Sequence, residues 1–224
     1  MSTKLFRLLT ALSGIAGVIM LITSFSINPG PPSNATIAQL TAFAKQNFTS
    51  ILWGAWLQAV GPLLNVLFAF AIVCLAGATT RLAGWMTLFG GAILMMVSLV
   101  EITFYIGTLY STTTGLISGE LIHAVQHLYF IVAAPALFLP LGVVILGSRV
   151  LPRVFGYLAL VLGAAFAILG VVFLYSLTLP APVLAFAGLQ TFWWLAAAIT
   201  LIVRPEKTSD TASVKKQAPV GSAP

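Results

Sequence analysis

Charged side chains are scarce in this chain. Only 6% of its 224 residues are Asp, Glu, Lys or Arg, whereas 60% are hydrophobic. Soluble globular domains carry about 25% charged residues, which cover the surface that faces water. So few charges exclude an ordinary soluble domain of this length. The composition predicts an integral membrane protein whose main partner is the lipid bilayer.

Cysteine pairs and basic clusters are lacking as well. The single cysteine, Cys74, lies inside an apolar run, which excludes an intrachain disulfide and a cysteine-based metal cluster. The net charge is +6, but the basic residues stand singly near the ends of the apolar runs and form no stripe. Nucleic acid is therefore not an expected partner.

Six apolar runs are long enough to cross a bilayer. A span needs about 20 mostly apolar residues, since ~30 Å of hydrocarbon is crossed at ~1.5 Å per residue. The runs lie at about 5–27, 51–78, 82–110, 121–146, 154–177 and 183–203. They predict an all-α bundle of six transmembrane helices over residues 1–204. Apolar periodicity is missing from residues 205–224, which are predicted to form a disordered cytoplasmic tail.

The basic residues give these spans an orientation. Short loops rich in Lys and Arg stay on the cytoplasmic side during insertion. Most basic residues fall on one predicted face, namely Lys4, Arg7, Arg81, Arg149, Arg153, Arg204, Lys207, Lys215 and Lys216. Only Lys45 falls on the other face. This distribution predicts an even number of spans, with both termini in the cytoplasm.

The first apolar run has a second interpretation. Residues Met1–Ser26 combine basic residues, an apolar stretch and small residues near the end, as a cleaved signal peptide does. Cleavage would leave five spans. The apolar core is longer than the ~7 to 15 residues usual for a signal, which favours a retained transmembrane helix.

The segment between the first two runs begins with a turn cluster, Asn28–Asn34, and continues with an amphipathic stretch. Within residues 36–48, apolar residues recur at steps of three and four: Ile37, Leu40, Phe43, Ala44 and Phe48. This spacing predicts a helix that lies on the outer membrane surface. A solvated loop is the alternative.

Glu101 is an ionisable residue inside the third predicted span. Such a side chain costs free energy in hydrocarbon, so it is expected to face the bundle interior and to have a partner. If the third and fourth runs form an antiparallel hairpin, residues whose numbers add to about 228 lie at matching depth. This register pairs Glu101 with His127. Helical spacing adds Glu120 and His123 to the face of His127.

Other polar residues enter the membrane to a similar depth from the predicted outer side. Together they predict a polar layer in the outer half of the bundle, formed by Glu101, His127, His123, Tyr105, Gln126, Gln58 and Gln190. Three prolines interrupt backbone hydrogen bonding in the second and fourth spans, at Pro62, Pro135 and Pro140. Kinks at these residues would open a cavity beside the layer, although prolines are also common in membrane helices.

Three functions fit such a layer. A carboxylate beside two imidazoles is typical of a proton relay or of a site that binds a transported small solute. The same groups can instead hydrogen-bond only to each other, as in a structural or partner-binding membrane subunit. The third function is a metal-dependent intramembrane enzyme with a single Zn or Fe ion, whose candidate ligands are His123, His127, Glu120 and Glu101.

The junction after the fourth run resembles a known family. The stretch Leu141–Gly156, and within it Ser148, Pro152, Arg153 and Gly156, is similar to the junction between the fourth and fifth helices of an uncharacterised bacterial family of small six-span proteins. The family is of the domain-of-unknown-function kind. The resemblance implies the inner membrane of a bacterium and supplies no activity.

Overall fold

The computed structural model describes residues 2–28, 36–110, 115–172 and 181–204. This part of the chain contains helices and no strands, which confirms the predicted all-α fold. The elements are α1 (Thr3–Ile27), α2 (Ile37–Gln46), α3 (Phe48–Leu75), α4 (Leu82–Tyr110), α5 (Gly115–Leu128), the π-helical turn η1 (Tyr129–Ala133), α6 (Ala134–Leu146), α7 (Arg153–Val172) and α8 (Ala181–Val203). The end of the fifth predicted span and the predicted tail lie outside the described residues.

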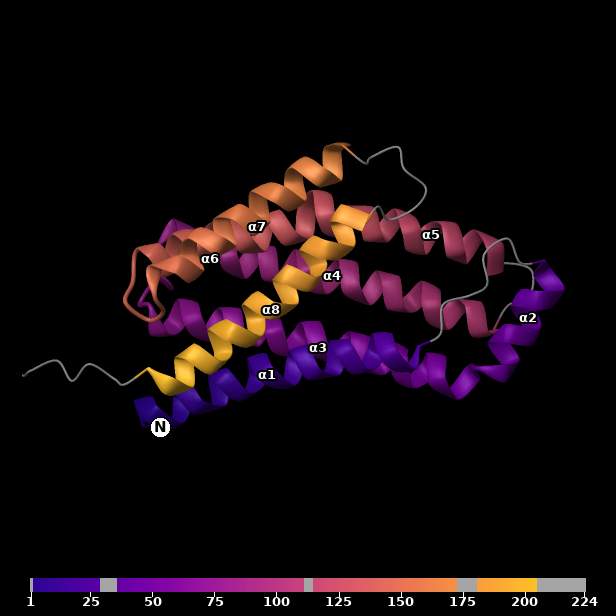
Figure 1. Ribbon diagram of the computed structural model, residues 1–224, viewed down its shortest axis with the longest axis horizontal. Coiled ribbons are helices and arrows are strands. Elements are labelled where there is room, and N and C mark those ends of the chain that lie inside the picture. The colour runs from indigo at the N-terminus through magenta and orange to yellow at the C-terminus, as the bar shows by residue number, and fades with distance from the viewer. Residues whose placement is uncertain (1, 29–35, 111–114, 173–180, 205–224) are drawn as a thin grey trace, which may run out of the picture.

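Six helices in the described ranges are long and apolar enough to cross a membrane, as the sequence predicts. The fourth of these is the continuous helix formed by α5, η1 and α6, of which Ala124–Leu146 is the apolar part. Successive spans alternate in direction (Figure 1). The first and last described residues consequently lie at the same end of the bundle.

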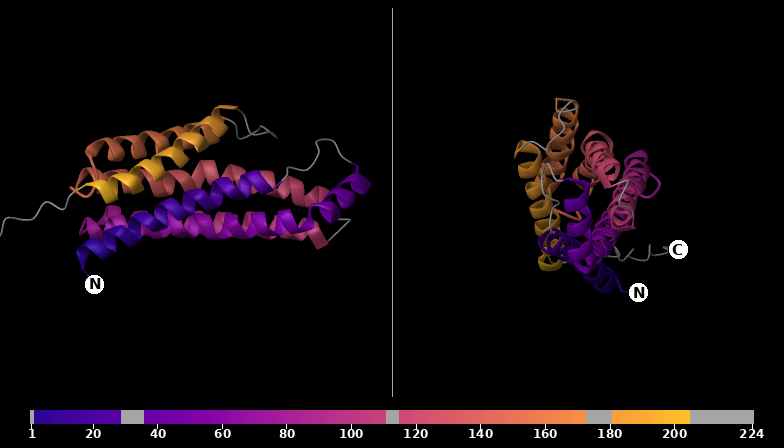
Figure 2. Two further views of the ribbon diagram at one scale, coloured as in Figure 1. Left: turned by 60° about the horizontal axis from the view of Figure 1, so that its bottom comes forward. Right: turned by 90° about the vertical axis from the view of Figure 1, so that its right-hand side faces the viewer.

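The six spans form a closed ring. Each span packs against the next one along the chain, and α8 returns to pack against α1 (Figure 2). The guanidinium of Arg7 in α1 closes the ring at the terminal end. Its Nη2 donates to the carbonyl oxygen of Leu201 at 3.1 Å and to that of Arg204 at 3.0 Å. The carbonyls at the end of α8 have no partner within their own helix, so this bond satisfies them.

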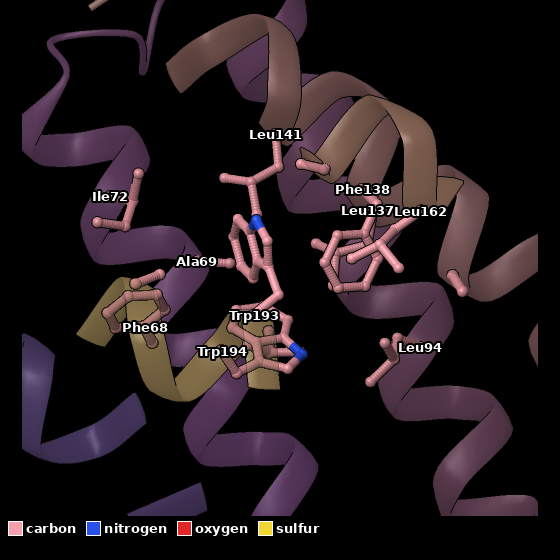
Figure 3. Packing of buried hydrophobic residues seen from close by; sticks show 14 of the residues in the cluster. Phe68, Ala69, Ile72, Leu94, Leu137, Phe138, Leu141, Leu162, Trp193 and Trp194 are labelled. Atoms are coloured by element: carbon pink, nitrogen blue, oxygen red, sulfur yellow. The ribbon is translucent and has the colours of Figure 1, made fainter. Parts of the chain in front are cut away.

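Aromatic side chains fill the inside of the ring. Phe138 of α6 packs against both Trp193 and Trp194 of α8, with its ring centroid 5.3 Å from that of Trp193 and 5.4 Å from that of Trp194 (Figure 3). Phe68 of α3 meets Trp194 edge-on at 5.8 Å. The indole N–H of Trp193 donates to the carbonyl oxygen of Phe155 at 3.0 Å, so its polar atom is paired within the apolar core.

Glycines let the helix backbones touch around the fourth span. A Cβ atom at Gly90 of α4 would collide with the carbonyl oxygen of Ala136 in α6. Pro140 lacks the N–H that would bond this carbonyl within the helix, so the carbonyl is free to face α4. On the opposite side, a Cβ atom at Gly170 of α7 would lie 2.7 Å from Cγ1 of Ile131 in η1. The fourth span is thus held closely between α4 and α7.

The segment between α1 and α3 forms a helix, α2, in agreement with the helical prediction for residues 36–48. Thr36 begins it with a capping box, in which its hydroxyl accepts from the backbone N–H of Gln39 and the Gln39 side chain accepts from the backbone N–H of Thr36. The position of α2 on the membrane surface stays a prediction. Asn34, in the preceding turn cluster, lies outside the described residues.

The two ends of the bundle differ in their number of basic residues. In the described part of the chain, one end carries Lys4, Arg7, Arg81, Arg149, Arg153 and Arg204 on the helix ends and loops. The other end, where α2 lies, carries only Lys45. Most of the described basic residues therefore lie at one end of the bundle, as the predicted order of spans requires. We refer below to these as the basic end and the α2 end.

Candidate functional site

Glu101 lies in α4 where three helices meet. Its carboxylate accepts a hydrogen bond from Nε2 of Gln126 in α5, with 2.9 Å between Nε2 and Oε1. It accepts another from the side-chain amide of Gln58 in α3. Two amides from two neighbouring helices therefore hold one carboxylate. An amide is neutral, so these bonds orient the carboxylate without supplying an opposite charge.

These three side chains lie well inside the bundle. Gln58, Glu101 and Gln126 are each nine to eleven residues from the end of their helix that faces the α2 end. At about 1.5 Å per residue, this is a depth of about 14 to 17 Å along the helices. All three also fall within apolar segments long enough to span a membrane. The group is therefore surrounded by hydrocarbon-facing helices rather than by a water-exposed loop.

Pro62 explains why Gln58 is a hydrogen-bonding centre. Proline has no N–H, so the carbonyl oxygen of Gln58, four residues earlier, loses its donor within α3. The hydroxyl of Ser98 in α4 donates to this carbonyl at 3.3 Å. Ser98 and Glu101 are one helical turn apart, so α4 binds both the backbone and the side chain of Gln58. This double attachment fixes α3 against α4 at the level of Glu101.

Two tyrosines border the carboxylate. The charge of Glu101 acts on the hydroxyl of Tyr105 in α4 and on that of Tyr129 in η1. The Tyr129 hydroxyl donates to Oε1 of Gln190 in α8 at 2.7 Å. The ring of Tyr129 packs edge-on against Phe166, with 6.1 Å between the ring centroids. Polar contacts therefore extend from Glu101 towards α8, on the far side of the ring.

The π-helical turn positions Tyr129. The backbone N–H of Ala134 bonds to the carbonyl oxygen of Tyr129, five residues earlier, where an α-helix would use four. Pro135 follows directly and cannot donate to the carbonyl of Ile131, so the helix widens before it. Gly170 leaves room for the widened turn against α7. Single π-helical turns occur often at functional sites.

The predicted polar layer is partly assembled by the contacts described above. Glu101, Gln58 and Gln126 are joined by direct hydrogen bonds. Gln190 accepts a hydrogen bond from Tyr129, whose hydroxyl is close enough to Glu101 to be influenced by its charge. A functional role for these residues stays a prediction, because hydrogen bonding alone does not assign one.

The sequence predicts His127 as the partner of Glu101, and this pairing stays a prediction. Gln126, one residue earlier on α5, donates a hydrogen bond to the carboxylate. The side chains of His123 and Glu120 lie outside the described part, so nothing tests the histidine face that the sequence predicts. The antiparallel register of α4 and α5 is within one residue of the one predicted.

A metal centre has no support among the described side chains. In that set, no three His, Cys, Asp or Glu residues come close enough to hold an ion. Two of the four candidate ligands, Glu120 and His123, lie outside the set. The metal-dependent enzyme with a Zn or Fe ion therefore stays a prediction.

Sequence reasoning missed two members of this cluster. Ser98 is three residues before Glu101 and shares its helix face, and Tyr129 is three residues after Gln126. Both spacings are visible in the sequence. The π-helical turn leaves a weaker signal, since Pro135 predicts an interruption but not its form.

The outer surface identifies the surroundings of the bundle. Large apolar side chains cover it, such as Phe25 and Phe89, each 70% exposed. Trp53 and Trp56 lie exposed near the α2 end and Trp85 near the basic end, as tryptophans do at the two surfaces of a membrane. Apolar surface that extends over six long helices is typical of a protein that contacts lipid.

These features define the class of the protein: it is a multi-pass, helical membrane protein in contact with the lipid bilayer. No protein-family model matches the chain, and no curated protein and no solved structure shows significant similarity to it.

Proposed function

We propose that this membrane protein transports protons or a small solute, and that Glu101 is the intramembrane binding group. The observation that carries the proposal is the convergence of Gln58 and Gln126 on the Glu101 carboxylate within three apolar helices. A carboxylate at this depth costs free energy in hydrocarbon, and transport sites are where membrane proteins retain such groups.

The packing of the remaining bundle supports a role beyond structure. Close glycine contacts and the aromatic core join the spans elsewhere without an ionisable side chain. A glutamate is therefore not needed to hold α3, α4 and α5 together, because neutral amides or hydroxyls would do so at lower cost. Its ionisable carboxylate is not required for packing, and it provides a site for a proton or a solute.

The shape of the α2 end also favours access to this site. α5 packs mainly on α4 and η1, and it extends past the ends of α7 and α8 (Figure 1). Among the described helices, the α2 end of α4 and α5 therefore extends beyond α7 and α8, and we take this end as the route of a solute to the carboxylate.

We also propose that the basic end faces the cytoplasm of a bacterium and that the α2 end faces outward across the inner membrane. The gathering of basic residues at one end and the resemblance of Leu141–Gly156 support this orientation. A variant without the exposed Cys74 would carry a single new cysteine at Lys45 or at Arg149. A membrane-impermeant maleimide added to intact cells is expected to label only the Lys45 position. Labelling of both positions would refute the orientation.

A flux assay tests the transport proposal. Purified protein is reconstituted into liposomes that contain a pH-sensitive dye, and a potassium gradient with valinomycin drives protons inward. Wild type is expected to acidify the lumen faster than empty liposomes, and Glu101→Gln to behave as empty liposomes. Glu206→Gln removes a carboxylate outside the six spans and serves as the matched control. Equal rates for wild type and Glu101→Gln would remove Glu101 from any proton pathway.

A further inference from the structure

The side-chain amide of Gln126 has one satisfied atom and one unsatisfied atom. Its Nε2 donates to the Glu101 carboxylate. Its Oε1 is buried and accepts no hydrogen bond. A buried acceptor without a donor costs free energy, and native proteins leave few of them unless a ligand or an ion completes the site.

The unsatisfied oxygen lies beside the carboxylate. Oε1 and Nε2 of Gln126 are bonded to the same carbon atom, and Nε2 is 2.9 Å from Oε1 of Glu101. Two acceptors, the Gln126 oxygen and the Glu101 carboxylate, therefore lie on adjacent groups, beside the N–H that joins them. This pair carries one formal negative charge when Glu101 is ionised. A cation fits this environment, whereas an anion or an apolar molecule does not.

We infer that the cluster binds a small monovalent cation, with the Glu101 carboxylate neutralising its charge and Oε1 of Gln126 coordinating it. The inference rests on the proposed function, because it names the class of ligand for the same site. One carboxylate balances one positive charge, so a divalent ion would leave an unpaired charge in hydrocarbon. A sodium ion takes carboxylate and amide oxygens as ligands, and an ammonium ion donates hydrogen bonds to the same atoms.

Gln58 provides an internal comparison. Its amide also donates to Glu101, but of these two amides only that of Gln126 is recorded with a buried oxygen that accepts no hydrogen bond. Replacing Gln58 by methionine removes a donor and leaves both cation ligands in place. Replacing Gln126 by methionine removes a similar donor and one of the ligands. The difference between the two variants therefore reports the role of the Gln126 oxygen.

Thermal unfolding of the purified full chain in detergent tests the inference. NaCl, NH4Cl and choline chloride are titrated at constant ionic strength. The pH is fixed because Glu101, Tyr105, His127 and Tyr129 are titratable. A ligand that binds only the folded state raises the unfolding midpoint in a saturable way. Sodium or ammonium is expected to do so, and choline, which is too large and has no N–H, is not.

The variants then locate the cation. Gln126→Met is expected to weaken the apparent affinity about tenfold or more, and Gln58→Met to change it less than about threefold. Glu101→Gln is expected to abolish the response. Gln126→Asn, whose shorter side chain withdraws both amide atoms from Glu101 but keeps a polar group, provides a second variant should Gln126→Met fail to fold.

The possible results separate this inference from the transport proposal. A response to sodium alone identifies a metal ion as the ligand, and a response to ammonium identifies a nitrogen cation. Stabilisation by neither, alongside proton flux that requires Glu101, would overturn the cation inference and leave proton transport standing. Equal losses in Gln126→Met and Gln58→Met would also overturn it. Cation binding without flux would retain the inference and reject transport.

Discussion

The aromatic core and the polar cluster join the spans of the bundle by different means. In the core, Phe138, Trp193 and Trp194 fill the ring of spans and their contacts depend on shape. In the polar cluster, Glu101 and Gln126 meet through a hydrogen bond that depends on the chemistry of both groups. The aromatic core therefore packs without an ionisable group, and we expect Glu101 to be dispensable for packing. The cluster is therefore where a function beyond packing is expected.

The largest expected effect is the loss of an aromatic ring from the core. Phe138→Ala leaves a cavity beside two tryptophans, and we expect the free energy of unfolding to fall by about 3 to 5 kcal/mol. Phe192→Ala is the control, because Phe192 is 69% exposed on the neighbouring helix. Unfolding in mild detergent measures both variants. Similar losses in the two would mean that the core is not the stabilising region.

The next effect concerns the backbone contact between α4 and α6. A methyl group in Gly90→Ala would collide with the carbonyl of Ala136, and separating the helices is expected to cost about 2 to 3 kcal/mol. Gly107→Ala, on the same helix, has no atom within 4 Å of the added carbon. That control is expected to be neutral or slightly stabilising, since alanine favours helices by about 1 kcal/mol over glycine. Thermal unfolding measures the stability of both variants. Equal stabilities of Gly90→Ala and Gly107→Ala would contradict the contact.

A smaller effect is expected from the hydroxyl of Ser98. Ser98→Ala leaves the carbonyl of Gln58 without a donor, which is expected to cost about 1 kcal/mol. In a Pro62→Ala background the helix regains its own N–H donor, so the same Ser98→Ala change is expected to cost almost nothing. A double-mutant cycle measures the coupling. Equal costs in both backgrounds would show that Ser98 acts independently of Pro62.

The smallest effect is expected at the link between η1 and α8. Tyr129→Phe removes the hydroxyl that bonds to Gln190, and such bonds contribute about 0.6 kcal/mol on average in membrane proteins. Tyr157→Phe serves as the control, because Tyr157 is exposed on α7. The two variants are compared by unfolding in the same detergent. A loss well above 2 kcal/mol for Tyr129→Phe would mean that this link is part of the stabilising core.

The sequence predicts the helices better than it predicts the cluster. Hydrophobic length alone gives the six spans, because a membrane demands about 20 apolar residues per crossing. Depth along a helix predicts that Glu101, Gln58 and Gln126 share a level. It does not predict that Gln126 donates to Glu101, since one residue turns a helix by about 100° and the direction of each side chain depends on how the helices are rotated.

The remaining features arise from tertiary contacts that no local pattern reveals. The π-helical turn requires both Pro135 in its own helix and Gly170 in another. The hydroxyl of Ser98 acquires a partner only because Pro62, in a different helix, frees the carbonyl of Gln58. Sequence spacing identifies candidate residues, whereas helix crossings decide which of them meet.

Thermal unfolding of Glu101→Gln tests the central claim most directly, because it asks whether Glu101 is needed for packing. A glutamine at this position still accepts a hydrogen bond from Gln126 and removes a charge from hydrocarbon. We therefore expect the variant to unfold within about 1 kcal/mol of wild type, or to be more stable. A loss of about 3 kcal/mol or more would show that the carboxylate holds the helices together. Glu101 would then be a structural residue.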